Sequence, residues 1–394
     1  MNLQPVPSAI FTRLLAALCF LLPCLAIAQL AAPPPEFEPP VASSHATEPA
    51  EGLIKLDVVV TMESGILVAD LVQKDFKLLD NGQPAKILSF HSFNEVSSRP
   101  YPPVEIIFVL DQLQLPVSLA SRGRDAVVAF LRQNGGHLAQ PVSIYSLVDT
   151  GLWLLADPST DGNALATQII KNHPIRLAGR LRGSARGSIP ESLEFQDPPM
   201  LEALQSLGNI ATAARQKPGR KLLLWIGPGW GIGSGAYVDG TSTHEQTFYT
   251  VRWFSTLLRE ARITLYSFSL REDDSHGEND SHSQAYLDYL HGAQSARDAK
   301  FMHLYRKVLA VESGGRVLDN SDDLVPQIQS CVNEASAFYT ITFDPSHADH
   351  ADEYHDLKVQ MSSPQLTAHT NTGYYDQPFY TDQPISTPTR ITVD

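Results

Sequence analysis

The chain has 394 residues, of which 43% are hydrophobic and 18% are charged, and this composition excludes an intrinsically disordered protein. The length accommodates two domains of ordinary size. A formal net charge of -14 argues against a general affinity for nucleic acid or anionic lipid, because both are themselves negatively charged.

The first 28 residues have the pattern of a secretion signal. Arg13 is the only basic side chain before an apolar stretch, residues 14–22, and Ala26-Ile27-Ala28 supplies the small residues of a cleavage site. The stretch is shorter than the roughly 20 apolar residues of a membrane-spanning helix. We therefore expect an exported protein, in the periplasm or outside the cell, with no transmembrane segment after signal removal. An uncleaved anchor is the alternative.

Residues 29–51 are rich in proline, alanine and glutamate, which predicts an extended linker. From 52 to 98 the pattern is that of strands. Residues 53–60 alternate between polar and apolar, and the runs 76–80 and 86–90 flank Asn81-Gly82, which favours a tight turn. A unit of this size does not form a stable core alone.

From 104 to 335 buried strands alternate with helices, a pattern typical of a mostly parallel sheet covered on both faces. Asp161 is the expected N-cap of a helix with Leu165, Ile169 and Ile170 on one face, and Gly314-Gly315 should end a long helix. The predicted strands are 104–111, 142–148, 152–155, 221–226 and 263–269. The predicted helices are 118–133, 161–172, 200–216, 245–261, 284–312 and 322–335.

Residues 336–376 return to strands, at 336–343, 356–361, 366–370 and 373–375. Both terminal strand units are small and flank the same α/β segment. We therefore predict that they pair with each other. The fold class is thus α/β, a doubly wound, mostly parallel sheet inserted in a small discontinuous β-sandwich-like domain. Residues 377–394 are polar and are expected to fray.

Cys331 is the only cysteine left after the signal is removed, so no internal disulfide can form. Its place in a predicted helix indicates a packing role. Export would also separate the protein from ATP and NAD, so we expect no nucleotide ligand.

Several segments together resemble a known family. They are residues 72–84, the strand that ends at Asp111, residues 217–221 before an apolar strand, residues 312–316, and the late Phe338-Tyr339-Thr340-Ile341 and Gly373-Tyr374-Tyr375. This combination is similar to the exported von Willebrand factor A-related proteins of Acidobacteria, over residues 50 to 376. The resemblance implies a von Willebrand A-like domain, and such domains bind protein ligands, often through a metal ion.

The resemblance also implies an Asp-x-Ser-x-Ser metal element, which here is Asp111-x-Leu113-x-Leu115. Leucine supplies no oxygen ligand, and a hard divalent cation needs several. The other metal-binding elements are not matched: residues 227–231 contain no carboxylate, and Ser188 and Ser192 are candidates for a threonine ligand by position alone. We expect a vestigial metal site at Asp111 and no cofactor, although a divalent cation is not excluded.

Four loops, among them residues 112–117, carry the other candidate residues. The glycine-rich loop 227–236 follows a strand without leading into a helix, which does not favour a dinucleotide site. Such loops lie where α/β sheets bind ligands, so Gln112, Gln114, Trp230 and Asp239 are candidates for ligand recognition. His347 and His350, in loop 344–355, are candidate metal ligands. Loop 271–283 mixes acids with histidines in no recognised spacing.

No nucleophile elbow, paired catalytic carboxylates or reactive cysteine is recognisable, so no catalytic residue is predicted. We expect a non-catalytic module that recognises an unknown protein or cell-envelope partner through loops 112–117, 227–243 and 271–283. The alternative is a metal-handling protein or hydrolase that uses the histidine-rich loops.

Overall fold

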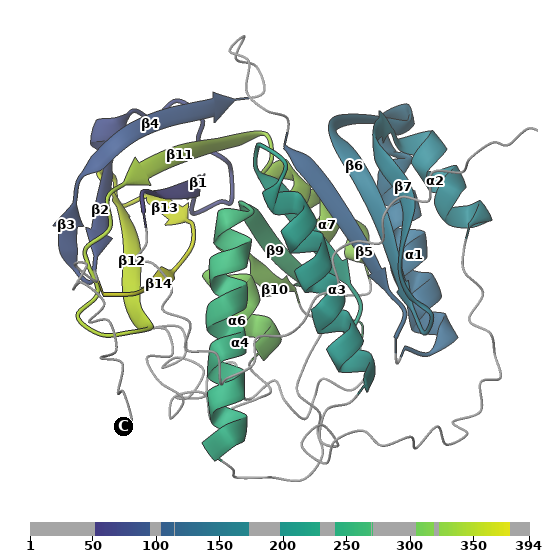
Figure 1. Cartoon of the computed structure of the whole chain (residues 1–394). Coiled ribbons are helices and arrows are strands. Elements are labelled where there is room, and N and C mark those ends of the chain that lie inside the picture. Colours follow the sequence, from purple (N-terminus) through teal and green to yellow (C-terminus); the bar gives the residue numbers. More distant parts are fainter. Residues whose placement is uncertain are drawn as a thin grey trace, which may run out of the picture. The chain divides into compact units, whose positions relative to one another are not determined.

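The computed structural model describes residues 52–94, 104–113, 115–172, 198–228, 241–268, 270, 305–318 and 323–378. The expected signal, the linker and the tail beyond Pro378 lie outside these ranges. The described part contains a six-stranded sheet and two four-stranded sheets (Figure 1). None of the helices within these ranges is long and apolar enough to cross a membrane.

The six-stranded sheet has the order β10-β9-β8-β5-β6-β7. Its strands from β10 to β6 pair in parallel, and β7 at the edge is antiparallel to β6. The strands are β5 (Glu105–Asp111), β6 (His137–Val148), β7 (Gly151–Asp161), β8 (Lys221–Ile226), β9 (Ile263–Phe268) and β10 (Arg316–Leu318).

Helices cover both faces of this sheet, so the expectation of a mostly parallel sheet covered on both faces is confirmed (Figure 1). One core contains residues of α3 (Pro198–Arg215), α4 (Thr241–Glu260) and α6 (Tyr305–Glu312). The other contains residues of α1 (Val117–Leu131), α2 (Gly162–Lys171) and α7 (Leu324–Asn333). Strand β8 is buried throughout because its alternate side chains enter these two cores.

The start of α2 shows how local sequence sets an element. The Asp161 side chain accepts a hydrogen bond from the backbone of Ala164 at 2.9 Å, as an N-cap residue does. Leu165 and Ile169 are buried as expected, but Ile170 is 53% exposed, so the apolar face is narrower than predicted.

Cys331 is buried in α7, and burial raises the pKa of its thiol to about 12.

The two four-stranded sheets combine strands from both ends of the chain (Figure 1). One has the order β13-β1-β11-β4, with β1 (Ile54–Met62), β4 (Ile87–Asn94), β11 (Ala337–Phe343) and β13 (Leu366–His369). The other has the order β14-β12-β2-β3, with β2 (Phe76–Asp80), β3 (Gln83–Ala85), β12 (Glu353–Met361) and β14 (Gly373–Asp376). A third hydrophobic core contains residues of both sheets, such as Val58, Leu78 and Ile341.

The turn at Asn81-Gly82 forms, with both residues at positive φ. However, the partner of β2 across this turn is β3 rather than the expected run 86–90, which belongs to β4 in the other sheet. The reason is that the chain changes sheets at Lys86, immediately after the short edge strand. Short 3-10 turns at Gln73–Asp75 and Gln133–Gly136 complete the described elements.

A partly buried ion pair connects the six-stranded sheet to the sheet that contains β1. Arg262, in the turn before β9, donates to both carboxylate oxygens of Asp57 on β1, at 3.0 and 2.5 Å. Thr340 on β11 also donates to Asp57, at 2.9 Å. The side chains of Arg262 and Asp57 are only 16% and 8% exposed, so this contact is both desolvated and hydrogen-bonded.

A second polar group is buried where α6, α4 and β12 meet. Glu312, the last residue of α6, is 2% exposed. Within the described ranges, no donor lies in good hydrogen-bond geometry to either oxygen of its carboxyl. Burial raises its pKa to about 8, although Ser255 on α4 lies near enough to lower it slightly. Burial raises the pKa of the Tyr354 hydroxyl on β12, and the charge of the Glu312 carboxyl raises it further.

Candidate functional site

Asp111 lies at the carboxyl end of β5, between the ends of β6 and β8. It is in register with Leu147 on one side, and its neighbour Leu110 is in register with Ile226 on the other. Carboxyl ends of parallel strands are where open α/β sheets bind their ligands. The prediction that a strand ends at Asp111 is confirmed, and the residue lies at the carboxyl edge of the sheet.

The carboxylate of Asp111 is enclosed by protein donors. One oxygen accepts the backbone N–H of Leu113 at 3.0 Å, and the other accepts the indole N–H of Trp225 at 2.9 Å. Asp111 is 2% exposed and Trp225 is fully buried. Both oxygens of this buried carboxylate therefore already accept a protein donor, which leaves fewer lone pairs for a cation.

Leu113 and Leu115, which follow Asp111, have structural roles. Leu113 is buried in the core that contains Trp225, and Leu115 is buried in the core on the opposite face of the sheet. Gly227 is required beside them, because a Cβ at that position would lie 2.5 Å from the carbonyl oxygen of Asp111. The segment after Asp111 is thus packed against the sheet through Leu113 and Leu115.

Of the predicted recognition residues, only Gln112 lies within the described ranges. It is 7% exposed, its backbone N–H donates to the Leu147 carbonyl, and its side-chain amide donates to the Ser146 hydroxyl at 2.9 Å. This side chain is therefore engaged with β6 instead of being directed to a ligand. Gln114, Trp230, Asp239, Ser188 and Ser192 lie outside the described ranges, as do most of loops 227–243 and 271–283.

Two residues at this edge were missed by the sequence analysis. Trp225 was recognised only as part of an apolar strand, although a buried tryptophan needs an acceptor for its N–H, and Asp111 ends the neighbouring strand. Trp153, at the start of β7, is 53% exposed, and its indole donates to Thr150 at 3.1 Å. It is in register with Ser146 near the carboxyl end of β6, at the same edge as Asp111.

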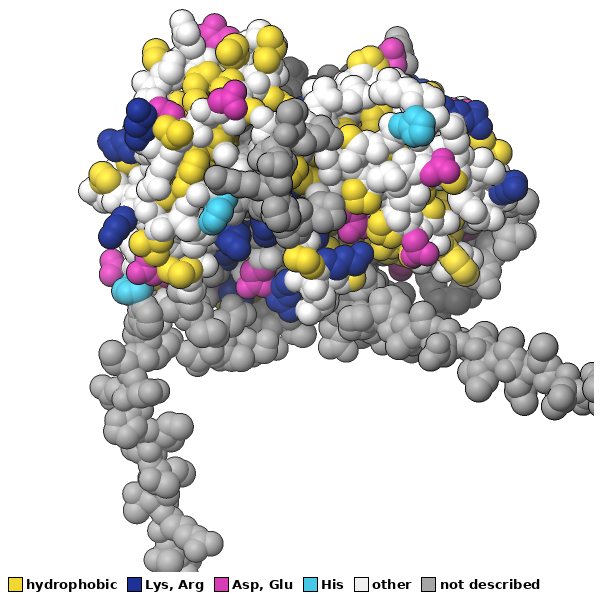
Figure 2. All heavy atoms as spheres, turned by 90° about the horizontal axis from the view of Figure 1, so that it is seen from above, with side chains coloured by type: hydrophobic (Ala, Val, Ile, Leu, Met, Phe, Trp, Pro, Cys, Tyr) yellow, Lys and Arg dark blue, Asp and Glu magenta, His cyan; other side chains and the backbone are white. Residues whose placement is uncertain are grey.

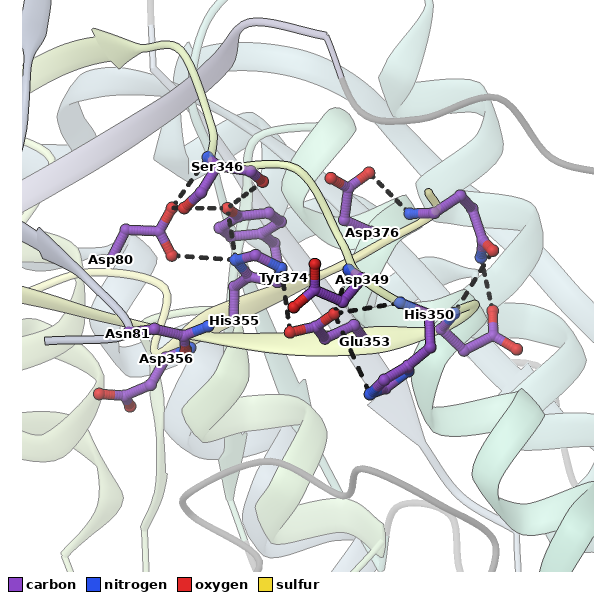
Figure 3. Close-up of polar contacts among 12 residues, drawn as sticks. Asp80, Asn81, Ser346, Asp349, His350, Glu353, His355, Asp356, Tyr374 and Asp376 are labelled. Carbon is purple, nitrogen blue, oxygen red and sulfur yellow. Dashed lines mark hydrogen bonds and ion pairs between the residues drawn. The ribbon is translucent and has the colours of Figure 1, made fainter. Parts of the chain in front are cut away.

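A second cluster of polar side chains surrounds Asp80 at the end of β2 (Figure 3). One carboxylate oxygen is 3.1 Å from Nδ1 of His355 on β12. The other accepts the Tyr374 hydroxyl of β14 at 2.8 Å, the backbone N–H of Ser346 at 3.1 Å, and the Ser346 hydroxyl. Tyr374 is also 3.0 Å from His355 Nδ1. Asp80, His355 and Tyr374 are all buried, whereas Ser346 is exposed.

The electrostatics of this cluster favour a charged pair of Asp80 and His355. Burial acts to raise the pKa of Asp80, but the hydrogen bonds from His355, Ser346 and Tyr374 outweigh it and lower that pKa. Burial acts to lower the pKa of His355, but the bond to Asp80 and the charges of Asp80, Glu353 and Asp376 raise it. Both shifts stabilise the ionised forms.

Serine, histidine and aspartate are all present in this cluster, but their order differs from that of a catalytic triad. In a triad the histidine lies between the serine, whose proton it takes, and the aspartate. Here the aspartate lies between the other two, and Nε2 of His355 is 3.9 Å from Glu353. The arrangement can hold β2, β12, β14 and the loop at Ser346 together.

The candidate metal ligands His347 and His350 lie in the loop that precedes β12 and are exposed. Nδ1 of His350 is 3.2 Å from the Ala351 carbonyl. Its Nε2 is 4.0 Å from Glu353 (Figure 3). Glu353 instead accepts the backbone N–H groups of Asp349 and His350, at 2.6 and 3.4 Å. In the described part of the chain, no three histidine, cysteine, aspartate or glutamate side chains are arranged to hold a metal ion.

Charged side chains show no concentration of one sign on the face drawn in Figure 2. Among the described residues, lysine and arginine are interspersed there with aspartate and glutamate.

Comparisons with known proteins give likeness of structure only. No family model and no curated protein sequence matches the chain. The VWA domain of SpRpn10 is similar over 59% of this chain and 95% of its own length, with 9% identity and a TM-score of 0.26. The pilus adhesin SpaC from Lactobacillus rhamnosus GG is similar over 77% of this chain, with 10% identity and a TM-score of 0.31. The human COPII-coat protein Sec24c is similar over 74%, with 9% identity and a TM-score of 0.27. The chain spans 48% and 46% of the last two structures.

Proposed function

We propose that this protein is an exported, non-catalytic recognition module that binds a protein or cell-envelope partner without a divalent cation. In this proposal a von Willebrand A-like domain of the Acidobacterial type is inserted in a discontinuous β-sandwich-like domain. The partner binds at the carboxyl edge of the six-stranded sheet. The metal site implied by the resemblance is vestigial.

The enclosed carboxylate of Asp111 carries this proposal. Its two oxygens are bonded to Leu113 and Trp225, and Leu113 and Leu115 are buried instead of carrying oxygen ligands. A partner at this edge must therefore be held by side chains. Apolar groups are available there, because Val117, at the start of α1, is 67% exposed, and Trp153 is 53% exposed. Large aromatic side chains are frequent anchors of protein interfaces.

Calorimetric titration tests the absence of a metal. Mg²⁺, Mn²⁺ and Ca²⁺ are expected to give no micromolar binding to the full chain or to Trp225→Phe, which releases one oxygen of Asp111 but adds no other ligand. Micromolar binding that Asp111→Ala abolishes would contradict the proposal.

Cross-linking with mass spectrometry in envelope fractions tests the binding edge. Cross-linked partners should be the same with and without chelator, and Trp153→Ala should reduce their yield by at least fivefold. Leu88→Ala is the matched control, because Leu88 is 48% exposed on β4, away from this edge. Equal losses in both variants, or loss of cross-links with chelator, would contradict recognition at the proposed site.

A further inference from the structure

A cavity of about 150 Å³ lies at the amino edge of the six-stranded sheet, opposite to the edge that carries Asp111. Its buried inner wall is formed by Ile106 of β5, Phe130 of α1 and Val142 of β6. The 3-10 turn that follows α1 forms one side, and the last turn of α7 forms the other. A cavity of this volume holds a single small molecule. We call it the amide cavity, because amide side chains surround it.

The side chains that line the amide cavity are polar but uncharged. None of the described residues in its lining is aspartate, glutamate, lysine or arginine, and His137 is the only titratable one. Six of them carry an amide or a hydroxyl group: Gln133, Asn134, Gln140, Gln329, Asn333 and Ser336. A charged ligand would lose its hydration here without meeting a counter-charge, which is costly. The lining therefore suits a neutral polar molecule.

Two amides on the α7 side are held in a fixed arrangement. Nε2 of Gln329 donates to Oδ1 of Asn333 at 2.7 Å, which leaves Oε1 of Gln329 as an acceptor and Nδ2 of Asn333 as a donor. The Ser336 hydroxyl donates to the Asn333 carbonyl at 2.7 Å, so the hydroxyl oxygen can still accept a hydrogen bond. Donors and acceptors side by side match neighbouring hydroxyl groups of a ligand, because each hydroxyl both donates and accepts.

The turn on the opposite side of the amide cavity also has a fixed geometry. Asn134, Gly135 and Gly136 all have positive φ, at 49°, 70° and 83°. Asn163 of α2 donates to the Gly135 carbonyl at 2.7 Å, and a Cβ at Gly136 would lie 2.3 Å from the Asn163 side chain. This turn positions Gln133 and Asn134 in the lining, and within the described ranges neither side chain has a hydrogen bond to the protein. Both amides are thus available to a ligand.

Apolar surface completes the lining. Leu138 of β6 and Val332 of α7 are only half-buried and border the cavity, so they offer contact to C–H groups. Amides around apolar surface match a sugar ring, which carries hydroxyl groups around two faces of C–H bonds. We propose that the amide cavity binds a single neutral monosaccharide, at a site separate from the edge to which the proposed function is assigned.

Titrations of the full chain with glucose, galactose and N-acetylglucosamine, followed by saturation-transfer NMR, test this proposal. At least one of these sugars should bind saturably and at least tenfold more tightly than glucuronate, which carries a charge, and glycerol, which has hydroxyl groups but no ring. Hydrogen exchange should slow in residues 131–138 and 329–336 when the sugar binds. No saturable binding of any of the three sugars, or equal affinity for glucuronate or glycerol, would overturn the proposal.

Substitutions locate the binding in the amide cavity. Gln329→Leu removes the acceptor beside Asn333 and should weaken sugar binding at least tenfold. Gln168→Leu is the matched control and should leave the affinity unchanged, because Gln168 and Asn172 form a similar amide pair on α2, at 2.6 Å, and neither lines the cavity. Ala139→Trp fills the cavity from an exposed position and should abolish binding.

Urea unfolding of each variant verifies that it is folded before its affinity is compared. Equal affinities of Gln329→Leu and Gln168→Leu, or unchanged binding to Ala139→Trp, would show that the sugar binds elsewhere and would overturn the assignment.

Discussion

Glu312 gives the sharpest test of how this structure responds to pH. Its pKa is raised from 4.5 to about 8 because the carboxyl is buried at the contact of α6, α4 and β12. In the unfolded chain the same group ionises near 4.5. Between these two values the folded protein holds a proton that the unfolded chain has released, so stability falls as pH rises through this window.

The size of this effect follows from the two pKa values. Each pKa unit between the folded and the unfolded protein corresponds to about 1.4 kcal/mol. Relative to its value below pH 4.5, the free energy of unfolding is therefore lower by about 3 kcal/mol at pH 7 and by up to about 5 kcal/mol above pH 8. Glu312→Gln keeps the shape of the side chain and cannot ionise. It should change stability little at pH 4.5 and raise the free energy of unfolding progressively toward pH 8.

Urea unfolding of both proteins from pH 4.5 to 9 measures this difference. The increase in the free energy of unfolding caused by Glu312→Gln should grow by several kcal/mol from pH 4.5 to 9. Glu260→Gln is the control, because Glu260 is 39% exposed in an ion pair with Arg215, and it should give a nearly constant difference. Parallel pH profiles for wild type and Glu312→Gln would show that the carboxyl is solvated or paired in the folded protein, contrary to this reasoning.

Three other substitutions test individual contacts by urea unfolding. Arg262→Ala should cost about 1.5–3 kcal/mol because the partly buried Asp57 loses the two hydrogen bonds from Arg262 and keeps the one from Thr340, and the double variant with Asp57→Ala should cost less than the sum of the two single variants; simple additivity would show that the pair is not coupled. Trp225→Phe should cost about 1–3 kcal/mol because a buried oxygen of Asp111 loses its donor, while Trp153→Phe on the surface should cost little; equal effects would contradict the enclosed carboxylate. His355→Gln should abolish a stabilisation that is fully present below pH 6.5 and lost as pH rises through the raised pKa of His355, so a stability difference that does not shrink with rising pH would refute the ion pair with Asp80.

The α/β part of the fold was predictable because its signals are local. The run 221–226 is continuous and apolar, and it forms β8 with the same limits. Asp161 caps α2 as expected, because an N-cap depends only on the next three residues. β10 was not predicted, since a strand of three partly buried residues carries no periodic pattern.

The partners of the candidate sites were harder to predict than their positions. Asp111 was identified from the strand it ends, but Trp225, which encloses it, is 114 residues away along the chain. Asp80 and His355 are separated by 275 residues, and Asp80 was read only as the residue before a turn. Contacts of this kind depend on strand order and register, which local patterns do not determine.

The pairing of Ile54 with Phe343 has a consequence for how the molecule is made. The ribosome synthesises β1 long before β11. The backbone N–H and C=O groups along the edge of β1 therefore lack this partner strand until nearly three hundred further residues have been added. Pairing between such distant segments is slow, and open edges invite aggregation during the delay. Pairing of β1 with β11 is therefore expected to be a late step of folding.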